Sequence, residues 1–362
     1  MYEIKINSKL VIAVLIFISI LYGSQIFILW TQQCIYDKEL TTFQYVLPII
    51  IIFCFVILIF LALKTSETLY SYIYTIFGLY LGYIIYLFQI SVVLRLLILF
   101  IDLPKLLLIS LLYIVPLIIC IYGVINALKT KVDRITLKYP GYNNSIKILH
   151  LSDLHLGAIH QKGSVLRIVQ EIQELEPDIV VITGDMADGS LKVKPGWLAP
   201  FNNLVMPILY VTGNHEEMNP KEDMVKIINE SNIKYIGENE TFKFKGVNFI
   251  GEDFGYDLRK CLINVEQKNG VPNVLLYHVP NLAPDELVKY NIFLMLAGHT
   301  HGGQIFPLGI LAYLANSCFS GLYVDKLNSH YVYVSEGVNN AVVPMRVGSS
   351  RIFALITIEG YN

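Results

Sequence analysis

Four long apolar runs in the first third of this chain constrain its fold more than any other feature. They cover about 9–30, 44–63, 70–100 and 106–128, and residues 1–128 hold only six of the 27 Lys and Arg residues and five of the 29 Asp and Glu residues. A helix needs ~20 mostly apolar residues to cross the hydrocarbon core of a bilayer. We therefore predict a bundle of about four transmembrane helices over residues 1–128.

The third run is the longest of the four, and it contains one charge, Arg95. It is too long for one upright span and too short for two spans with a turn, so we predict one tilted helix in which Arg95 snorkels or faces protein. Two other interpretations have less support. Buried helices of a soluble domain seldom run ~20 residues without a polar face. A cleaved signal peptide over residues 1–24 lacks a clear small-x-small site and leaves three further runs unexplained.

The distribution of charge predicts the orientation of these spans. With four spans, one face collects seven Lys and Arg residues from 5–9, 64 and 129–138, and the other collects only Lys38 and Lys105. The positive-inside rule then makes this a multi-pass protein of the cell membrane with everything after residue 128 on the cytoplasmic side. Three or five spans would reverse that side. None of the five cysteines requires an oxidising compartment.

The chain changes character after residue 128, where all eight histidines and most charges lie. With a net charge of −2, neither half is basic enough to suggest nucleic acid. Short β-branched runs alternate with amphipathic segments, which predicts strands at 146–153, 178–185, 208–216, 247–253, 273–280, 292–303, 330–338 and 351–359 and helices at 163–177, 221–231 and 283–290. This alternation predicts an α/β sandwich over 146–362, with helices outside. Charged and turn-forming residues predict a linker at 129–145.

Five of the predicted strands end in carboxylates, an amide or histidines beside turn formers. The motifs are "HLSDLHLG", "VITGDMADG", "VTGNHEE", "LLYHVP" and "LAGHTHGG". Taken singly, most have a plainer interpretation as a loop hydrogen bond, a turn or a buried histidine. The last motif is the strongest, because His299 and His301 would project to one side of an extended chain. Open α/β sheets place their sites at such strand ends, so the five motifs together indicate one site.

Seven side chains from these motifs form a candidate set of metal ligands: Asp153, His155, Asp185, Asn214, His278, His299 and His301. Carboxylate, imidazole and amide ligands suit Mn, Fe, Zn or Ni. Seven ligands are too many for one tetrahedral ion, but they suit two ions that share a carboxylate. Two ions about 3.5–4 Å apart can clamp the attacking and leaving oxygens of a displacement at phosphorus. The neighbouring glycines would allow sharp turns and the close approach of a bulky anion.

The motifs Asp-x-His, Gly-Asp-x-x-Asp, Gly-Asn-His-Glu, a lone His and Gly-His-x-His resemble, in order and approximate spacing, those of the calcineurin-like metallophosphoesterases. "SDLHLG", "GHTHGGQI" and "SEGVNNAVVPMRVGSSRIFALITI" look most like the bacterial membrane-associated YaeI/YkuE-type branch. The likeness covers residues 146–362. It implies a four-layer α/β/β/α metallophosphoesterase sandwich with a binuclear metal centre, which would make 146–362 a catalytic domain.

The resemblance also implies a role for each candidate ligand. One ion would be held by Asp153, His155, Asp185 and His301, and the other by Asp185 as a bridge with Asn214, His278 and His299. His215 would lie just outside the metals. In the protein Ser/Thr phosphatases of this superfamily the second motif continues into Arg-Gly, whereas here Gly189 and Ser190 follow Asp188. This departure argues against a phosphoprotein substrate.

Four further residues are candidates for catalysis or substrate binding. His215 would protonate the leaving oxygen or steady its charge, a role worth roughly 10²–10⁴-fold. Asp188 would orient His215, with a plain turn cap as the alternative. Arg346 would grip a phosphate with its planar fork, with a surface ion pair as an equal alternative. His160 would reach the substrate, although a solvent-exposed loop histidine is the simpler interpretation.

An uncharged segment, "QIFPLGILAYLANSCFSGLYV", follows the last histidine motif at 304–324. Pro307 and several Gly, Asn and Ser residues interrupt a strand pattern, so we predict an apolar loop beside the metal site that rests in the bilayer interface. With the predicted spans, it suggests a membrane-anchored phosphoesterase acting on a phosphodiester or pyrophosphate of an amphiphilic, lipid-linked substrate. Helices that merely tether a soluble phosphodiesterase are one alternative. Another is a membrane receptor or transport component that binds a phosphorylated ligand without turnover.

Overall fold

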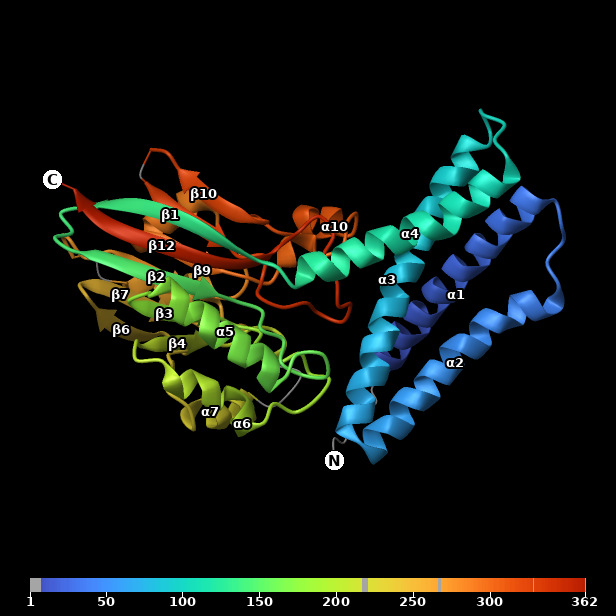
Figure 1. The fold of residues 1–362 in the computed structure, drawn as a ribbon. Helices are drawn as coiled ribbons and strands as arrows, with labels where there is room; N and C mark the ends of the chain where they lie inside the picture. Colours follow the sequence, from blue (N-terminus) through green and yellow to red (C-terminus); the bar gives the residue numbers. More distant parts are fainter. Residues whose placement is uncertain (1–7, 217–220, 266–267, 328, 362) are drawn as a thin grey trace. The chain divides into compact units, whose positions relative to one another are not determined.

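The computed structural model describes residues 8–216, 221–265, 268–327 and 329–361. The chain divides into two compact units, Met1–Gly123 and Val124–Asn362. The first consists of long helices, and the second of two sheets with shorter helices (Figure 1).

The long helices of the first unit are α1 (Ser8–Tyr36), α2 (Thr42–Thr65), α3 (Glu67–Leu97) and α4 (Lys105–Ala127), the last of which ends in the second unit. All four are long and apolar enough to cross a membrane, in agreement with the predicted spans. The third is a single helix of 31 residues, as expected. The Arg95 guanidinium lies 3.8 Å from the centre of the Trp30 ring, so its charge faces protein.

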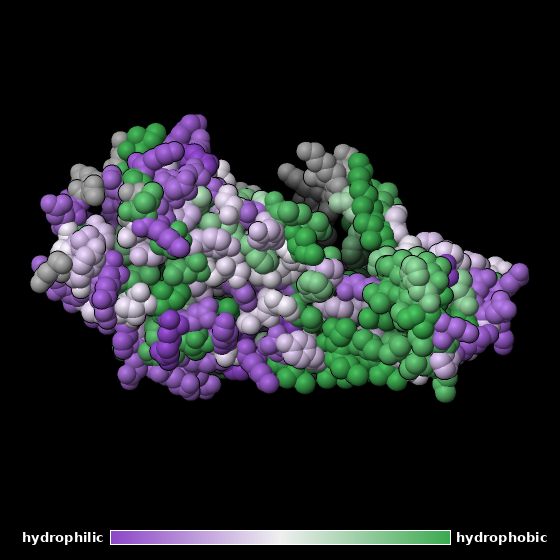
Figure 2. Space-filling view, turned by 90° about the horizontal axis from the view of Figure 1, so that it is seen from above, coloured by the Kyte–Doolittle hydropathy of each residue, from purple (hydrophilic) through white to green (hydrophobic). Residues whose placement is uncertain are grey.

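These helices pack through a narrow apolar seam and direct many other apolar side chains outward. Ile28, Leu87, Leu94 and Leu112 are buried in the seam, while most residues of α2 are exposed. Figure 2 shows hydrophobic residues over the long helices and mainly hydrophilic residues over the sheets. An outward apolar surface of this kind is stable in lipid and unfavourable in water.

Two six-stranded mixed sheets form the second unit. The first has the order β1-β12-β2-β3-β4-β5, with β1 (Thr130–Pro140), β12 (Arg351–Tyr361), β2 (Ser145–Leu151), β3 (Ile179–Thr183), β4 (Ile208–Val211) and β5 (Ile233–Tyr235). The second has the order β10-β11-β9-β8-β7-β6, with β10 (Gly321–Asp325), β11 (His330–Val334), β9 (Leu294–Ala297), β8 (Asn273–Leu276), β7 (Val247–Gly251) and β6 (Glu240–Phe244). Strands β2, β3 and β4 run parallel, as do β7, β8 and β9.

Helices cover the outer faces of both sheets, which confirms the predicted four-layer sandwich (Figure 1). Between strands of the first sheet the chain forms α5 (Lys162–Leu175), α6 (Pro195–Leu198), η1 (Ala199–Asn203) and α7 (Lys221–Asn229). Between strands of the second it forms α8 (Leu258–Cys261), η3 (Leu262–Asn264), α9 (Pro284–Leu287) and η4 (Val288–Tyr290). The core between the sheets contains Ile148 and Val181 from one sheet and Phe249 and Leu296 from the other. Helix α5 buries apolar side chains at helical spacing, as its sequence predicts.

The predicted linker at 129–145 is wrong over most of its length, because 130–140 form strand β1. This strand pairs in parallel with β12 along its whole length, from Thr130 opposite Arg351 to Pro140 opposite Tyr361. Strand β1 lies at the edge of the first sheet, and its exposed positions carry charges such as Lys131 and Lys138. Charged side chains are common on edge strands, and here they conceal the strand pattern.

The apolar segment 304–324 contains more regular structure than the predicted loop. Helix α10 (Gly309–Ala315) lies within it, strand β10 begins at Gly321, and a single 3-10 turn, η5 (His301–Gly303), comes before it. Most residues of α10 are exposed, and none is buried. The short strands β5 and β6 also lie outside the predicted elements.

Candidate metal centre

Each predicted ligand lies within four residues after the end of a strand: Asp153 and His155 after β2, Asp185 after β3, Asn214 after β4, His278 after β8, and His299 and His301 after β9. Because β2, β3 and β4 are parallel neighbours, as are β8 and β9, the carboxyl ends of the strands in each sheet open at one edge. Both sheets therefore contribute side chains to one place.

Tight turns, not extended strands, aim these side chains. Five of the candidate ligands have left-handed backbones: Asp153 (φ 56°), His155 (φ 43°), Asp185 (φ 52°), His299 (φ 74°) and His301 (φ 53°). The expectation that His299 and His301 project together from an extended chain is wrong, since β9 ends at Ala297. Such backbones cost ~1–3 kcal/mol each in non-glycine residues and persist where the surrounding structure holds them. The turns thus fix the directions of the candidate ligand side chains.

Glycines beside the ligands leave room for the carboxylates. A Cβ atom on Gly213 would lie 2.2 Å from Asp185 Oδ1, and one on Gly298 would lie 2.5 Å from Asp153 Oδ2. Both separations are far below van der Waals contact, so a larger residue would displace a candidate ligand. Glycine is therefore required at these two positions because the carboxylates leave no room for a Cβ atom. The sequence alone did not indicate this reason.

Three ligand atoms meet on one side of the centre. Nε2 of His155 lies 2.9 Å from Nε2 of His301. Oδ1 of Asp153 lies 3.3 Å from the His301 nitrogen and 3.9 Å from the His155 nitrogen. These are the residues, together with Asp185, that the family resemblance assigns to one ion.

Asn214, His278 and His299 meet on the other side. Oδ1 of Asn214 lies 2.7 Å from Nδ1 of His299 and 3.1 Å from Nε2 of His278. Nδ1 of His278 lies 2.7 Å from the Thr183 carbonyl, so it donates its proton there and leaves Nε2 facing the centre.

Asp185 joins the two groups. Its Oδ2 lies 3.2 Å from Nε2 of His278 and 3.8 Å from Nε2 of His155. An imidazole lone pair and a carboxylate oxygen repel each other unless a proton or a cation lies between them. The side chain thus occupies the position expected of a shared ligand, although its coordination remains a prediction.

The spacing of these atoms fits metal ions. An ion with nitrogen and oxygen ligands at ~2.0–2.2 Å separates neighbouring ligand atoms by about 3–3.5 Å. The separations at the centre run from 2.7 to 3.9 Å, a range that includes these values. Three groups of His and Asp atoms lie close enough to hold an ion: Asp153, His155 and His301; His155, Asp185 and His215; and Asp153, Asp185 and His278. The side chains present therefore fit a centre for more than one cation.

Burial and neighbouring charges together set the protonation of the cluster. Burial holds the pKa of His155 well below its ordinary value and lowers that of His301 to about 4. Both rings are thus neutral at physiological pH, the form in which imidazole binds metal. Burial also opposes a charge on His278, but the Asp185 carboxylate outweighs it and raises the His278 pKa to about 10. His278 and His155 together hold the Asp185 pKa below its usual range, against the effect of burial.

Sequence reasoning missed Glu216, which holds two of the ligand loops together. Its carboxylate accepts hydrogen bonds from the backbone N–H groups of Asp185 (3.0 Å), Ala187 (3.0 Å) and Gly213 (2.6 Å). Burial and the nearby Asp185 charge raise the pKa of Glu216 to about 7. Its place in the "GNHE" motif was a signal for a role at the site, because a charged residue is rarely buried without such partners.

His215 lies beside the candidate ligands with its ring partly open to solvent. Its Nδ1 is 3.2 Å from the backbone carbonyl of Asp188, and its Nε2 is 4.0 Å from Asp185 Oδ2. The Asp188 carboxylate instead accepts from the N–H and hydroxyl of Ser190, at 2.7 and 2.6 Å. Orientation of His215 by that carboxylate is therefore wrong, and the turn-cap alternative describes what it does. The Asp188 carbonyl is the group that orients the His215 ring.

Arg346 is buried beneath the centre, and the predicted phosphate contact is wrong. All five guanidinium N–H groups have acceptors: the carbonyls of His301, Glu336, Gly337 and Asn339 and the side chains of Asn340 and Ser349. The side chain is inaccessible to solvent, which also excludes the surface ion pair. Arg346 therefore holds the loop at His301 in place and has no N–H group free for a phosphate.

His160 is neither a solvent-exposed loop residue nor a member of the cluster of ligand atoms. It is partly buried, and its Nε2 accepts a 3.4 Å hydrogen bond from the backbone of Asn340. Burial and nearby arginines, Arg167 foremost, lower its pKa to about 3. A contact between His160 and substrate remains a prediction.

Known proteins resemble this chain over the sandwich. Residues 146–303 match the family model described as calcineurin-like phosphoesterase. A Helicobacter pylori protein named "Uncharacterized metallophosphoesterase" is 32% identical over 229 residues, which cover 60% of this chain and 61% of the relative. An Aquifex aeolicus protein of the same name is 32% identical over 232 residues, which cover 59% of this chain and 85% of the relative. The chain belongs to the calcineurin-like metallophosphoesterase family.

Metallophosphoesterases of this family use two divalent metal ions, and the candidate clusters supply suitable ligands without specifying the metal. A Bos taurus protein named "Transmembrane protein with metallophosphoesterase domain" is also similar, at 32% identity over 260 residues that cover 64% of this chain and 58% of the relative. Together with the four apolar helices, this likeness indicates a membrane protein. The chain spans less than two thirds of the length of the Helicobacter and bovine relatives. The YaeI/YkuE-type branch remains a prediction.

Proposed function

We propose that this metallophosphoesterase is anchored in the membrane and hydrolyses a phosphodiester or pyrophosphate bond of an amphiphilic, lipid-linked substrate. The observation that carries the proposal is the meeting of seven candidate ligand side chains from five strand ends at one place. Phosphoryl chemistry needs such a set, since there is little for a protein to do beyond positioning and the neutralisation of charge.

Asp153, His155, Asp185 and His301 would hold one ion, and Asp185, Asn214, His278 and His299 the other. When bound, the ions would acidify an attacking water and offset negative charge on the phosphate oxygens. The protein contributes rigidity: Glu216 fixes the loops after β3 and β4, and Arg346 fixes the loop at His301. Little reorganisation is then needed during the reaction.

His215 is the residue that we assign to the leaving oxygen. Its Nδ1–H donates to the Asp188 carbonyl, which directs Nε2 away from that turn and toward the centre. Its side chain is 21% exposed, against 0% for His155 and 12% for His301, so it has the most open ring of the three. An imidazole at the open side of a metal site suits proton transfer to a substrate that arrives from solvent or membrane.

Two features favour a lipid-linked substrate. Four helices of membrane length precede the sandwich, and the segment 304–324 beside His301 contains no charged residue. Gly189 and Ser190 stand where the phosphoprotein phosphatases have Arg-Gly, which argues against a phosphoprotein. The lipid bilayer is accordingly the partner that we propose, with no role for nucleic acid.

The experiment is turnover by the full chain in phospholipid nanodiscs loaded with Mn²⁺. Bis(p-nitrophenyl) phosphate, p-nitrophenyl phosphate and a radiolabelled bacterial lipid extract are the substrates, with EDTA-treated protein as the control. We expect metal-dependent release from the diester and the loss of at least one phosphorylated lipid. If protein that holds two ions per chain turns over none of these, the binding-only receptor alternative is favoured instead.

We further propose that the chain is multi-pass and that the sandwich is cytoplasmic, from the charge count of the loops. The natural cysteines are poor reporters, since Cys318 is buried and burial raises the pKa of the half-buried Cys261 to about 11. Val205→Cys, at an almost fully exposed position, in a chain whose own cysteines are replaced by serine is a better probe. A membrane-impermeant maleimide should label it only after cells are broken. Labelling in intact cells would place the sandwich outside.

A further inference from the structure

Helix α10 presents an apolar surface that the sandwich does not cover. We define the α10 surface as Leu308, Ile310, Leu311, Tyr313 and Leu314, which are between 48% and 74% exposed. Five large apolar side chains within seven residues make a contiguous patch, whereas scattered exposed apolar residues are normal on a soluble protein. A patch of this kind marks a surface that meets another apolar phase.

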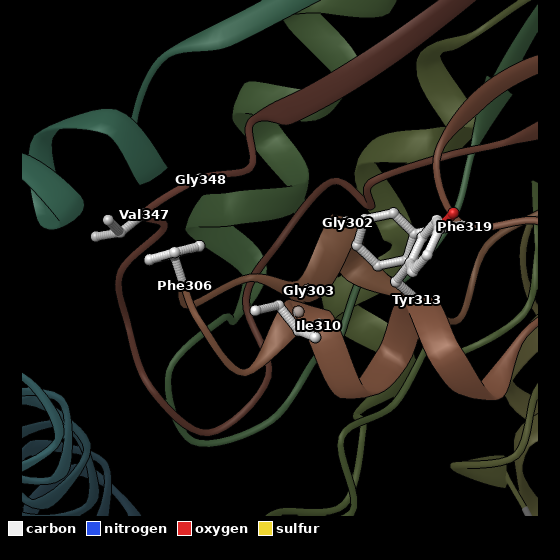
Figure 3. Close-up of a pocket in the computed structure, with 9 residues that line it drawn as sticks. Gly302, Gly303, Phe306, Ile310, Tyr313, Phe319, Val347 and Gly348 are labelled. Carbon is white, nitrogen blue, oxygen red and sulfur yellow. The ribbon is translucent and has the colours of Figure 1, made fainter. Parts of the chain in front are cut away.

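Two residues of the α10 surface, Ile310 and Tyr313, also line a cavity of about 260 Å³. Its other lining residues are Gly302, Gly303, Phe306, Gly309, Phe319, Val347 and Gly348. Figure 3 shows Ile310 and Tyr313 on the helix, with Phe306, Phe319 and Val347 on the segments beside it. The volume is sufficient for about nine groups the size of a water molecule or a methylene.

Polar contacts hold the α10 segment at both ends, so its exposure is not that of a loose loop. The Thr300 hydroxyl donates to the Phe319 carbonyl at 2.6 Å. Gln304 donates through Nε2 to the carbonyls of Ala341 and Val343, at 3.0 and 2.8 Å. Thr300 lies between the candidate ligands His299 and His301, and the cavity wall begins at Gly302. The α10 surface is therefore attached to the loop that carries His299 and His301, which we call the metal loop.

The same region is bound to the end of a membrane-length helix. Asn126, in the last turn of α4, donates through Nδ2 to the carbonyls of Arg346 (3.1 Å) and Ser349 (2.9 Å). Val347 and Gly348, which lie between those two residues, line the cavity. The last turn of α4 is thus hydrogen-bonded to the segment that lines the cavity with α10, and this link to a membrane-length helix favours lipid as the apolar phase.

We propose that the α10 surface inserts into the lipid bilayer and that hydrocarbon chains of lipid fill the cavity lined by Ile310 and Tyr313. An uncharged helix with leucine and aromatic side chains sits ~5–10 Å deep at the boundary between headgroups and acyl chains. This inference goes beyond the proposed hydrolysis, because it concerns lipid contact alone and holds for a water-soluble substrate as well. It would place the metal loop at the membrane surface.

The test uses tryptophan fluorescence of the full chain in nanodiscs whose phosphatidylcholine carries bromine on the acyl chains. The parent is Trp30→Phe, which removes the tryptophan of α1 and leaves buried Trp197 as a constant background. Leu314→Trp reports on the α10 surface, with Leu311→Trp as a second variant if the first does not fold. The control is Val205→Trp, which is 97% exposed and precedes β4, at the opposite end of that strand from Asn214.

We expect bromine to quench Leu314→Trp at least about twofold more than Val205→Trp, because insertion places the indole among acyl chains. Circular dichroism melting and metal content equal to those of the parent establish that each variant is folded. Equal quenching of the two tryptophans in folded protein overturns the proposal. A blue-shifted Leu314→Trp emission without bromine quenching also overturns it, since a protein surface or a second copy would then cover α10.

Discussion

Helix α2 and strand β2 carry similar apolar side chains and place them in opposite directions. On α2, Phe53, Leu58 and Leu61 are about half exposed or more, whereas Ile146, Ile148 and Leu149 on β2 are completely buried. Each arrangement lowers the free energy in a different solvent, since apolar surface is stable in lipid and is driven out of water. The contrast teaches that hydrophobicity alone does not fix which face of an element is buried.

The sandwich also buries ionisable side chains. In the sandwich, Asp153, Asp185 and His278 are almost inaccessible to solvent. Burying ionisable groups is costly unless they are paired or bound to a cation, so the sandwich concentrates that burial where the strands end. The α10 surface departs from the rest of the sandwich and follows the pattern of α2, which is why we assign it to lipid.

The largest effect is expected at the carboxylate between the two groups of ligands. Asp185→Asn should lower diester turnover by ~10³-fold or more, because a neutral amide cannot offset the charge of two cations. Plasma mass spectrometry should find fewer than two ions per chain. Asp188→Asn is the matched control and should keep both ions, since an amide oxygen still caps the turn at Ser190. Two ions in Asp185→Asn would contradict the shared position.

Next in size is the imidazole assigned to the leaving group. His215→Ala should lose roughly 10²–10⁴-fold in kcat while it keeps two ions, because only proton transfer is removed. His330→Ala removes a histidine at the amino end of β11, away from the centre, and should keep its turnover. Full activity of His215→Ala at every pH would show that the assigned role is wrong.

Substitution of Arg346 is expected to lower turnover less than the two changes above, and to lower the stability of the fold strongly. Arg346→Gln should lower the free energy of unfolding by ~3–5 kcal/mol, because several buried carbonyls lose their donors. Arg259→Gln is the control: its ion pair with Glu286 is half exposed, so the change should stay below about 1 kcal/mol. Urea unfolding followed by Trp197 fluorescence measures both. Similar midpoints for the two variants would mean that the guanidinium does not hold the loop.

The smallest expected effect is that of a leucine-to-alanine change on the outer face of α2. The same change in the core of the sandwich is the comparison. Leu149→Ala, in the core of the sandwich, should cost ~2–5 kcal/mol. Leu58→Ala, on the outer face of α2, should cost less than about 1 kcal/mol. The Leu58 side chain contacts lipid or detergent both in the folded unit and after the helices separate, so its removal changes the free energy of unfolding little. Unfolding of the detergent-solubilised chain gives the two values. It is read from Trp197 in a Trp30→Phe background for Leu149→Ala, and from Trp30 in a Trp197→Phe background for Leu58→Ala. Equal losses would remove the distinction between the two units.

Much of the architecture was predictable because its signals are local. Apolar runs of membrane length predicted α1 to α4, and the strand-end motifs predicted candidate ligands, each of which lies within four residues of a strand. The chemistry of each ligand type is carried by its own side chain, so Asp153 or His301 can be recognised without knowing the neighbours.

Features that depend on distant partners were not predictable. Arg346 looked like a phosphate ligand, since nothing in its own segment reveals that carbonyls from His301 and from Glu336 to Asn339 occupy its N–H groups. The aim of His299 and His301 depends on left-handed turns and not on strand alternation. The role of Glu216 depends on backbone N–H groups of another loop, the one after β3.

Strand β1 has a consequence for the order in which the molecule is made. Among the strands that the structure describes, its one neighbour in the first sheet is β12. Thr130 and Arg351, which face each other, are 221 residues apart in the sequence. At ~5–20 residues per second, a ribosome needs about 10–45 s to reach the second of them after the first. During that interval β1 is an unpaired edge attached to α4, and it is open to pairing with other strands until β12 emerges.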